Sequence, residues 1–131
     1  MLKIDFNSMK PIYLQIAEGI EDDIIRGELK EGDQAYSRLI ISRELGVNPA
    51  TAAKGINVLV LKGILEKQRG LSMVVASGAR ERLLADKRDN NIHSLTKELV
   101  TQARKVGMNK QSVLRLIDEL FDNVGGIEGN E

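Results

Sequence analysis

The chain has 131 residues, 19 basic and 19 acidic side chains, 42% hydrophobic residues and no cysteine. This length is typical of one domain with a small appendage, and the missing cysteine excludes disulfides, thiolate metal sites and cysteine nucleophiles. No apolar run reaches the roughly 18 residues of a membrane span, and the N-terminus lacks a signal-peptide core, so we expect a cytoplasmic protein.

The charges are unevenly distributed although their sum is zero. Residues 18–33 contain seven acidic and two basic side chains, whereas residues 34–76 contain six basic and two acidic ones. The basic segment is a weak indication of nucleic-acid binding. We interpret the acidic segment as a solvated face, because adjacent carboxylates such as Asp22 and Asp23 point about 100° apart on a helix.

The first predicted helix covers residues 11–26. Pro11 suits a first helical turn, and isoleucines recur every four residues at Ile16, Ile20 and Ile24, which is the period of a half-buried helix. Gly27 ends this helix, and residues 30–33 form a turn.

Two further helices follow in close succession. Ser37 is a good N-cap for a short helix that reaches Leu45 and ends at Gly46. After a turn of three residues, Asn48 caps a third helix that runs from Pro49 to about Lys62. Its buried face is predicted to hold Ala52, Ile56, Leu59 and Val60.

The hydrophobic period then changes from 3.6 to 2. Residues 64–69 and 71–75 are predicted to be two short strands around a turn at Arg69 and Gly70. Helix, helix, turn, helix and hairpin together predict a winged helix-turn-helix domain over residues 1–77. The fold class is therefore mainly α with one small β-hairpin.

Residues 78–131 form the second predicted segment. One long helix covers residues 79–106, Asn109 caps a last helix, and residues 125–131 form a frayed or disordered tail. Two helices are too few to hold a core alone, so we predict that a second copy of the chain covers their apolar stripes, while folding back onto the first domain is the alternative. The predicted dimer interface consists of Leu84, Ile92, Leu95, Leu99, Ala103, Val106, Val113, Ile117, Leu120 and Phe121.

The sequence gives little indication of an enzyme or of a cofactor-binding protein. His93 is the only histidine and lies in a polar stretch, where a solvated or interface role is more common than a metal or catalytic one. No catalytic triad spacing, zinc motif or phosphate-binding loop is present. We predict no enzymatic activity, no metal site and no cofactor, and the sequence identifies no small-molecule effector.

The third helix is the predicted recognition helix of a duplex DNA-binding protein, since the second helix of the pair enters the major groove. Ala50 and Ala53 face outward, where they allow close approach and can contact thymine methyl groups. Hydrogen bonds to bases or phosphates are expected from Asn48, Thr51 and Asn57, and positive charge from Lys54. The alternative is a plain surface helix that is rich in good helix formers.

The hairpin carries Lys67, Gln68 and Arg69 up to Gly70. An arginine at a hairpin tip suits insertion into the minor groove or contact with phosphates. A hairpin that is simply solvated is equally consistent with these residues.

The segments "PIYLQIAEGIEDDIIRGELKEGD" (residues 11–33) and "VNPATAAKGINVLVLKGILEKQRG" (residues 47–70) resemble the GntR family of transcriptional regulators, in its short YtrA-type subfamily. Residues 77–84 and 95–118 resemble that subfamily's two-helix C-terminal segment. The resemblance implies a homodimeric repressor that binds an inverted-repeat operator. It also places DNA contacts at Ser37, Asn48, Pro49, Ala50, Thr51, Lys54, Arg69 and Gly70.

Several positions depart from the family pattern, among them Tyr36, Ser72 and Val74, and one of the departures bears on a DNA contact. Many members have a DNA-contacting arginine where this chain has Leu39, so the resemblance leaves more of the contact to Arg38, Arg43 and the wing. Leu39 and the zero net charge also support an alternative function, a winged-helix module that binds a protein.

Overall fold

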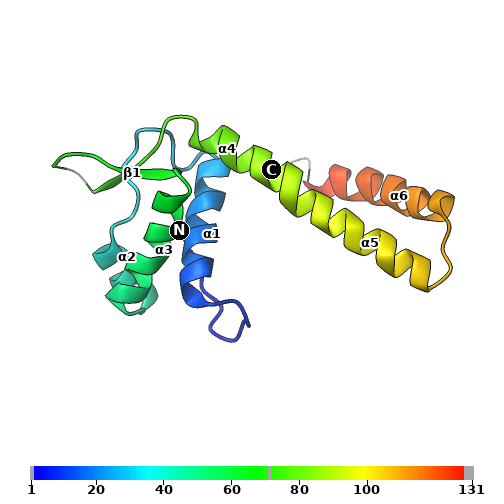
Figure 1. Cartoon of the computed structure of the whole chain (residues 1–131), viewed down its shortest axis with the longest axis horizontal. Coiled ribbons are helices and arrows are strands. Elements are labelled where there is room, and N and C mark those ends of the chain that lie inside the picture. The colour runs from blue at the N-terminus through cyan, green and yellow to red at the C-terminus, as the bar shows by residue number, and fades with distance from the viewer. Residues whose placement is uncertain (1, 71, 129–131) are drawn as a thin grey trace. The chain divides into compact units, whose positions relative to one another are not determined.

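The computed structural model describes residues 2–70 and 72–128, which divide between Lys87 and Arg88 into two compact units. The elements are labelled in Figure 1, and each unit is described by itself. Their bounds are α1 Ile12–Ile25, α2 Arg38–Leu45, α3 Pro49–Leu61, β1 Leu65–Lys67, β2 Met73–Val75, α4 Ala79–Asp86, the π-helical segment η1 Lys87–Ile92, α5 His93–Lys105 and α6 Lys110–Glu128.

The core of the first unit lies between α1 and α3, which run side by side (Figure 1). Ile16, Ile20 and Ile24 are buried, as their four-residue spacing predicts. The two helices run in the same direction, because Gly55 lies against Ile16 near one end and the Lys62 ammonium lies 3.2 Å from the Glu21 carboxylate near the other. The amino ends of α1 and α3 are therefore neighbours.

The helix-turn-helix forms as its capping residues predict. The Ser37 hydroxyl accepts a hydrogen bond from the Ile40 amide (3.1 Å), and the Asn48 side chain accepts one from the Ala50 amide (2.7 Å). Gly46 ends α2 with a φ of 67°, a left-handed conformation that costs glycine little. Both helix starts are thus fixed by local hydrogen bonds.

The hairpin pairs Leu65 with Val75 and Lys67 with Met73 in an antiparallel register. Its strands are shorter than predicted, and Leu71 lies outside the described residues. The segment before α2 also joins the hairpin, because the Ala35 amide donates to the Met73 carbonyl (2.8 Å). This extra pairing, which the sequence does not predict, holds the start of α2 against β2.

The first unit extends ten residues beyond the boundary predicted after Ser77. Ala79 and Leu83 of α4 are buried in its core. The Arg80 guanidinium donates to the Ile25 carbonyl (2.9 Å), and Arg82 donates to the carbonyls of Gly63 and Ser77. The division therefore follows Lys87, because α4 packs on α1.

The second unit consists mainly of α5 and α6. The helical backbone runs from Ala79 to Lys105 as predicted, but η1 interrupts the α-helical period, and its residues are all unburied. Asn109 caps α6 by accepting from the Ser112 amide (2.9 Å). The helix reaches Glu128 although a disordered tail is predicted from residue 125, because extending a formed helix costs little per residue; residues 129–131 lie outside the described residues.

Candidate nucleic-acid interface

The third helix presents the faces that its sequence predicts. Ala52, Ile56 and Leu59 are buried in the core, and Val60 is half-buried. Of the predicted contact residues, Asn48, Pro49, Ala50, Lys54 and Asn57 are exposed, and Thr51 is half-buried. Gly55, which the sequence did not single out, is buried against α1.

The two capping side chains have only part of their polar capacity free. The side-chain carbonyl oxygen of Asn48 is occupied by the Ala50 amide, so its NH2 group is what it can offer to DNA. The hydroxyl oxygen of Ser37 accepts from Ile40, which leaves its O–H as a donor for a phosphate. Both helix starts can thus donate hydrogen bonds to an anionic ligand.

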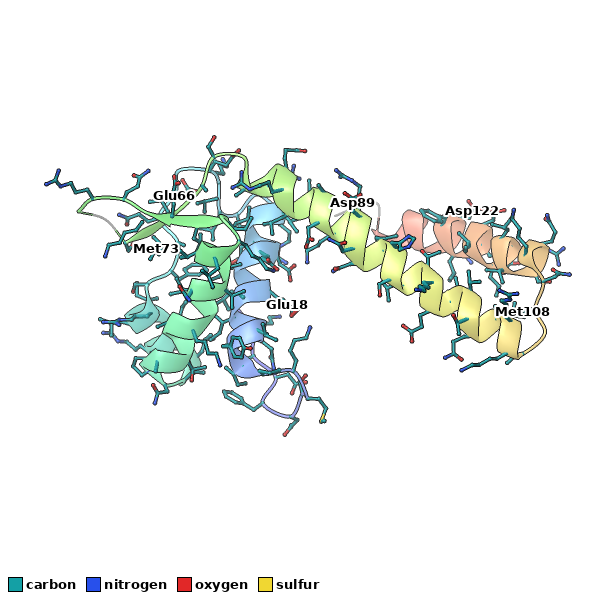
Figure 2. The ribbon with its side chains drawn as sticks, in the orientation of Figure 1. Glu18, Glu66, Met73, Asp89, Met108 and Asp122 are labelled. Carbon is teal, nitrogen blue, oxygen red and sulfur yellow. The ribbon has the colours of Figure 1, made fainter. Side chains whose placement is uncertain are left out.

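A hollow of about 490 Å³ lies between the start of α2, α3 and the hairpin; we call it the α2–α3 hollow. Figure 2 shows Met73, one of its lining residues, on the hairpin. Its polar lining is Ser37, Arg38, Asn57, Lys67 and Ser72, together with Tyr36. Its apolar lining is Leu39, Ala53, Ile56, Val60 and Met73. Among the residues that the structure describes, two cations and no carboxylate line it, so it suits a polyanion.

A second hollow, of about 410 Å³, opens on the other flank of α3, where Asn48, Thr51 and Lys54 meet Phe6 and Tyr13. The Lys54 ammonium lies 4.1 Å from the centre of the Tyr13 ring, a cation–π contact of about 0.5–1 kcal/mol at an exposed site. The sequence did not predict this contact, which depends on the parallel packing of α1 and α3. It holds the charge of Lys54 beside the amino end of α1.

The remaining predicted contacts lie outside both hollows. Arg43 is exposed in the last turn of α2, and Arg69 and Gly70 are exposed at the tip of the hairpin. Gly70 has a φ of 77°, which only glycine adopts readily and which allows the tight turn. The structure therefore brings Ser37, Arg38, Asn57 and Lys67 together and leaves the hairpin tip as a separate projection.

The acidic segment is the predicted solvated face at Asp22, Glu28, Glu31 and Asp33, which are exposed, but not at Glu21 and Asp23. The side chain of Asp23 is completely buried, and Glu21 is 4% exposed. Asp23 accepts hydrogen bonds from the Tyr36 hydroxyl (2.8 Å) and the Arg26 guanidinium (2.6 Å). Burial of these carboxylates is tolerated because each has a charged or hydrogen-bonding partner, and the sequence gives no direct sign of a partner 13 residues away.

Tyr36 therefore links α1 to the residue that caps α2. Burial, together with the hydrogen bond to Asp23 and its negative charge, raises the pKa of Tyr36 to about 12. Because the folded state holds the Tyr36 proton more tightly than the unfolded chain does, this contribution to stability is complete below pH 10.0 and is lost as the pH rises towards 12.

Tyr36→Phe is expected to lower the free energy of unfolding at pH 8 by about 1–3 kcal/mol, because Asp23 loses a donor while buried. The difference in free energy of unfolding between the variant and the wild type should become smaller above about pH 10, because the wild type then loses the stability that the protonated Tyr36 contributes. Urea unfolding at several pH values measures it, with Tyr13→Phe as the control for losing a phenol elsewhere. A difference that stays constant up to pH 11.5 would contradict the assigned hydrogen bond.

The residues predicted to form the dimer interface are mostly exposed on the second unit. Leu95, Val106, Leu120 and Phe121 are 60–76% exposed, Ile92 and Leu99 somewhat less. Ala103 is the only buried side chain in residues 88–123; Val113 and Ile117 are half-buried, as is Leu84, which lies on α4 in the first unit. Three further exposed apolar residues of this unit, Val100, Leu114 and Leu116, are not part of the predicted interface.

Two other kinds of site receive no support. No group of three or more potential metal ligands occurs within residues 2–70 and 72–128. In the same part of the chain, every helix is too short or too polar to cross a membrane.

The chain matches no protein-family model but has clear individual relatives. It is 28% identical to the HTH-type transcriptional repressor YtrA of Bacillus subtilis strain 168 over the full length of both chains. It is 31% identical to the uncharacterized HTH-type transcriptional regulator YhcF of the same strain, over 83% of this chain and 88% of the relative.

A solved structure agrees with these relatives. YtrA from Sulfolobus acidocaldarius, described as a GntR-family transcription factor, superposes with a TM-score of 0.57 and is 38% identical. The match covers 72% of this chain and 97% of that one. Together with the helix-turn-helix and hairpin, these similarities show that the chain belongs to the GntR family of transcriptional regulators, a family of non-enzymatic proteins, in its YtrA-type subfamily.

Proposed function

We propose that the chain is a cytoplasmic repressor that binds duplex DNA sequence-specifically, as a homodimer on an inverted-repeat operator. The observation that carries this proposal is the α2–α3 hollow, where Arg38, Asn57 and Lys67 lie beside the exposed face of α3 and no carboxylate is among the described lining residues. Cations supply affinity for phosphates, and amide and apolar groups can read base edges. The relative named YtrA is called a repressor, which supports the same role.

The homodimer rests on the second unit. Residues 88–123 bury only Ala103 and expose a row of large apolar side chains on α5 and α6. Exposed apolar area of this kind is characteristic of an interface, and a twofold dimer is the simplest way to cover it. Such a dimer presents two copies of α3, which explains why the expected operator is an inverted repeat.

Selection of bound sequences from a random pool of duplex DNA by the full chain tests the proposal directly. We expect enrichment of an inverted repeat whose half-sites are about 10 base pairs or a multiple apart. The alternative, a winged-helix module that binds a protein, is favoured by the exposure of Leu39 (58%). A pool without enrichment, at any salt concentration that keeps the protein soluble, would favour that module and refute the repressor.

Arg69→Ala is expected to weaken binding to the selected DNA and to reduce the slope of log K against log salt by about 0.9, the value for one phosphate contact. The reason is the exposed position of Arg69 at the tip of the hairpin. Fluorescence polarisation at four salt concentrations measures both effects. Lys30→Ala removes the same charge from the turn at residues 30–33 and should leave the slope unchanged. Equal slopes for the wild type, Arg69→Ala and Lys30→Ala would place the hairpin outside the interface.

A further inference from the structure

Leu39 has an unusual position for a large apolar side chain. It lies in the first turn of α2 and is 58% exposed, yet it is not isolated on the surface. It lines the α2–α3 hollow together with Ala53 and Val60 of α3 and Met73 of β2. The apolar residues that line the hollow thus come from three different elements.

The lining of the same hollow also includes polar and positively charged residues. Arg38 precedes Leu39 in the chain, Lys67 comes from the hairpin, and Asn57 lies one turn beyond Ala53 on α3. An apolar small molecule or peptide would not require two cations there. The occupant that fits is one with anionic groups outside and a small apolar group inside.

Duplex DNA offers this combination at one kind of base pair. In the major groove, thymine alone presents a methyl group, and it does so between two rows of phosphates. We propose that Leu39, together with Ala53, forms a pocket for a thymine methyl group and specifies thymine at one position of each operator half-site. This inference rests on the proposed function and adds to it the residue that sets base preference.

Replacing single thymines of the selected operator with deoxyuridine tests the pocket, because uracil pairs identically but lacks the methyl group. We expect deoxyuridine at one position per half-site to lower the affinity of the wild type about three- to fivefold. This is the effect of losing the burial of one methyl group. Leu39→Ala should bind the thymine operator more weakly and lose its sensitivity to deoxyuridine at that position. Its salt slope should equal that of the wild type, since no charge is removed.

Ile40→Ala is the matched control. Ile40 is 45% exposed in the same turn of α2 but does not line the hollow, so this variant should keep the full deoxyuridine penalty. Thermal melts of both variants check the fold. If the operator binds but no thymine is sensitive, or if Leu39→Ala keeps the penalty, the pocket is refuted while the repressor stands; failure to enrich any operator refutes both.

Discussion

Leu95→Asp combined with Leu120→Asp is expected to convert the proposed dimer into a monomer and to lower operator affinity by about 100-fold or more. The two leucines are 61% and 60% exposed, so the substitutions cost little packing within one chain. In a dimer they would bury charges in an apolar interface. Affinity falls because the two recognition helices are then no longer held in one molecule. The second helix therefore loses the high effective concentration at its half-site that the dimer provides.

Sedimentation velocity measures the assembly state, and fluorescence polarisation with the selected operator measures the affinity. Thr101→Asp combined with Gln111→Asp adds the same two charges at exposed polar positions of α5 and α6 and should leave both unchanged. A wild-type protein that sediments as a monomer at micromolar concentration would contradict the proposed dimer. A monomeric variant with undiminished affinity would show that one copy binds each site independently.

Gly55→Ala is expected to destabilise the protein by up to about 2 kcal/mol, because overpacking a closely packed core costs about 1–3 kcal/mol and the higher helix propensity of alanine offsets about 1 kcal/mol of that cost. An added Cβ at this position would lie 2.8 Å from the backbone carbonyl oxygen of Tyr13 and 3.0 Å from the Ile16 side chain. The contact with the carbonyl cannot be relieved by a rotamer change, so α1 and α3 must separate.

Gly19→Ala provides the comparison, since Gly19 is also inside a helix but its added Cβ would meet only the side chain of Leu2. That side chain can rotate, so the helix propensity of alanine should dominate and stability should be unchanged or higher. Urea unfolding at one fixed protomer concentration compares the two, because stability depends on concentration in a dimer. Equal free energies of unfolding for Gly55→Ala and Gly19→Ala would contradict the close contact of α1 with α3.

Most helix boundaries follow from the sequence because they depend on neighbouring residues. The hydroxyl of Ser37 and the amide of Asn48 cap helices that begin one residue later, and Gly46 adopts its left-handed conformation where the chain must turn. Hydrogen bonds of this kind span two or three residues. They form in the same way whatever the rest of the chain packs against.

The interruption of the long helix at η1 shows where local patterns stop being informative. Residues 87–92, which are polar except for Ile92, are compatible with an α-helix or a π-helix, and none of them is buried. Glu21 lies near Lys87, with 4.0 Å between the carboxylate and the ammonium. Such a contact depends on how α4 packs against α1. The periodicity of hydrophobic residues along the sequence does not predict it.

The sequence by itself determined the family, the helix-turn-helix with its wing, and the outward face of α3. Only the tertiary structure decided that Asp23 is buried beneath Tyr36, that Lys54 lies over the Tyr13 ring, and that Leu39 opens into a hollow between three elements. The physical reason is the sequence separation over which each kind of interaction acts. Periodicity and capping act within one helical turn, whereas these contacts join residues that become neighbours only when α1, α2, α3 and the hairpin pack together.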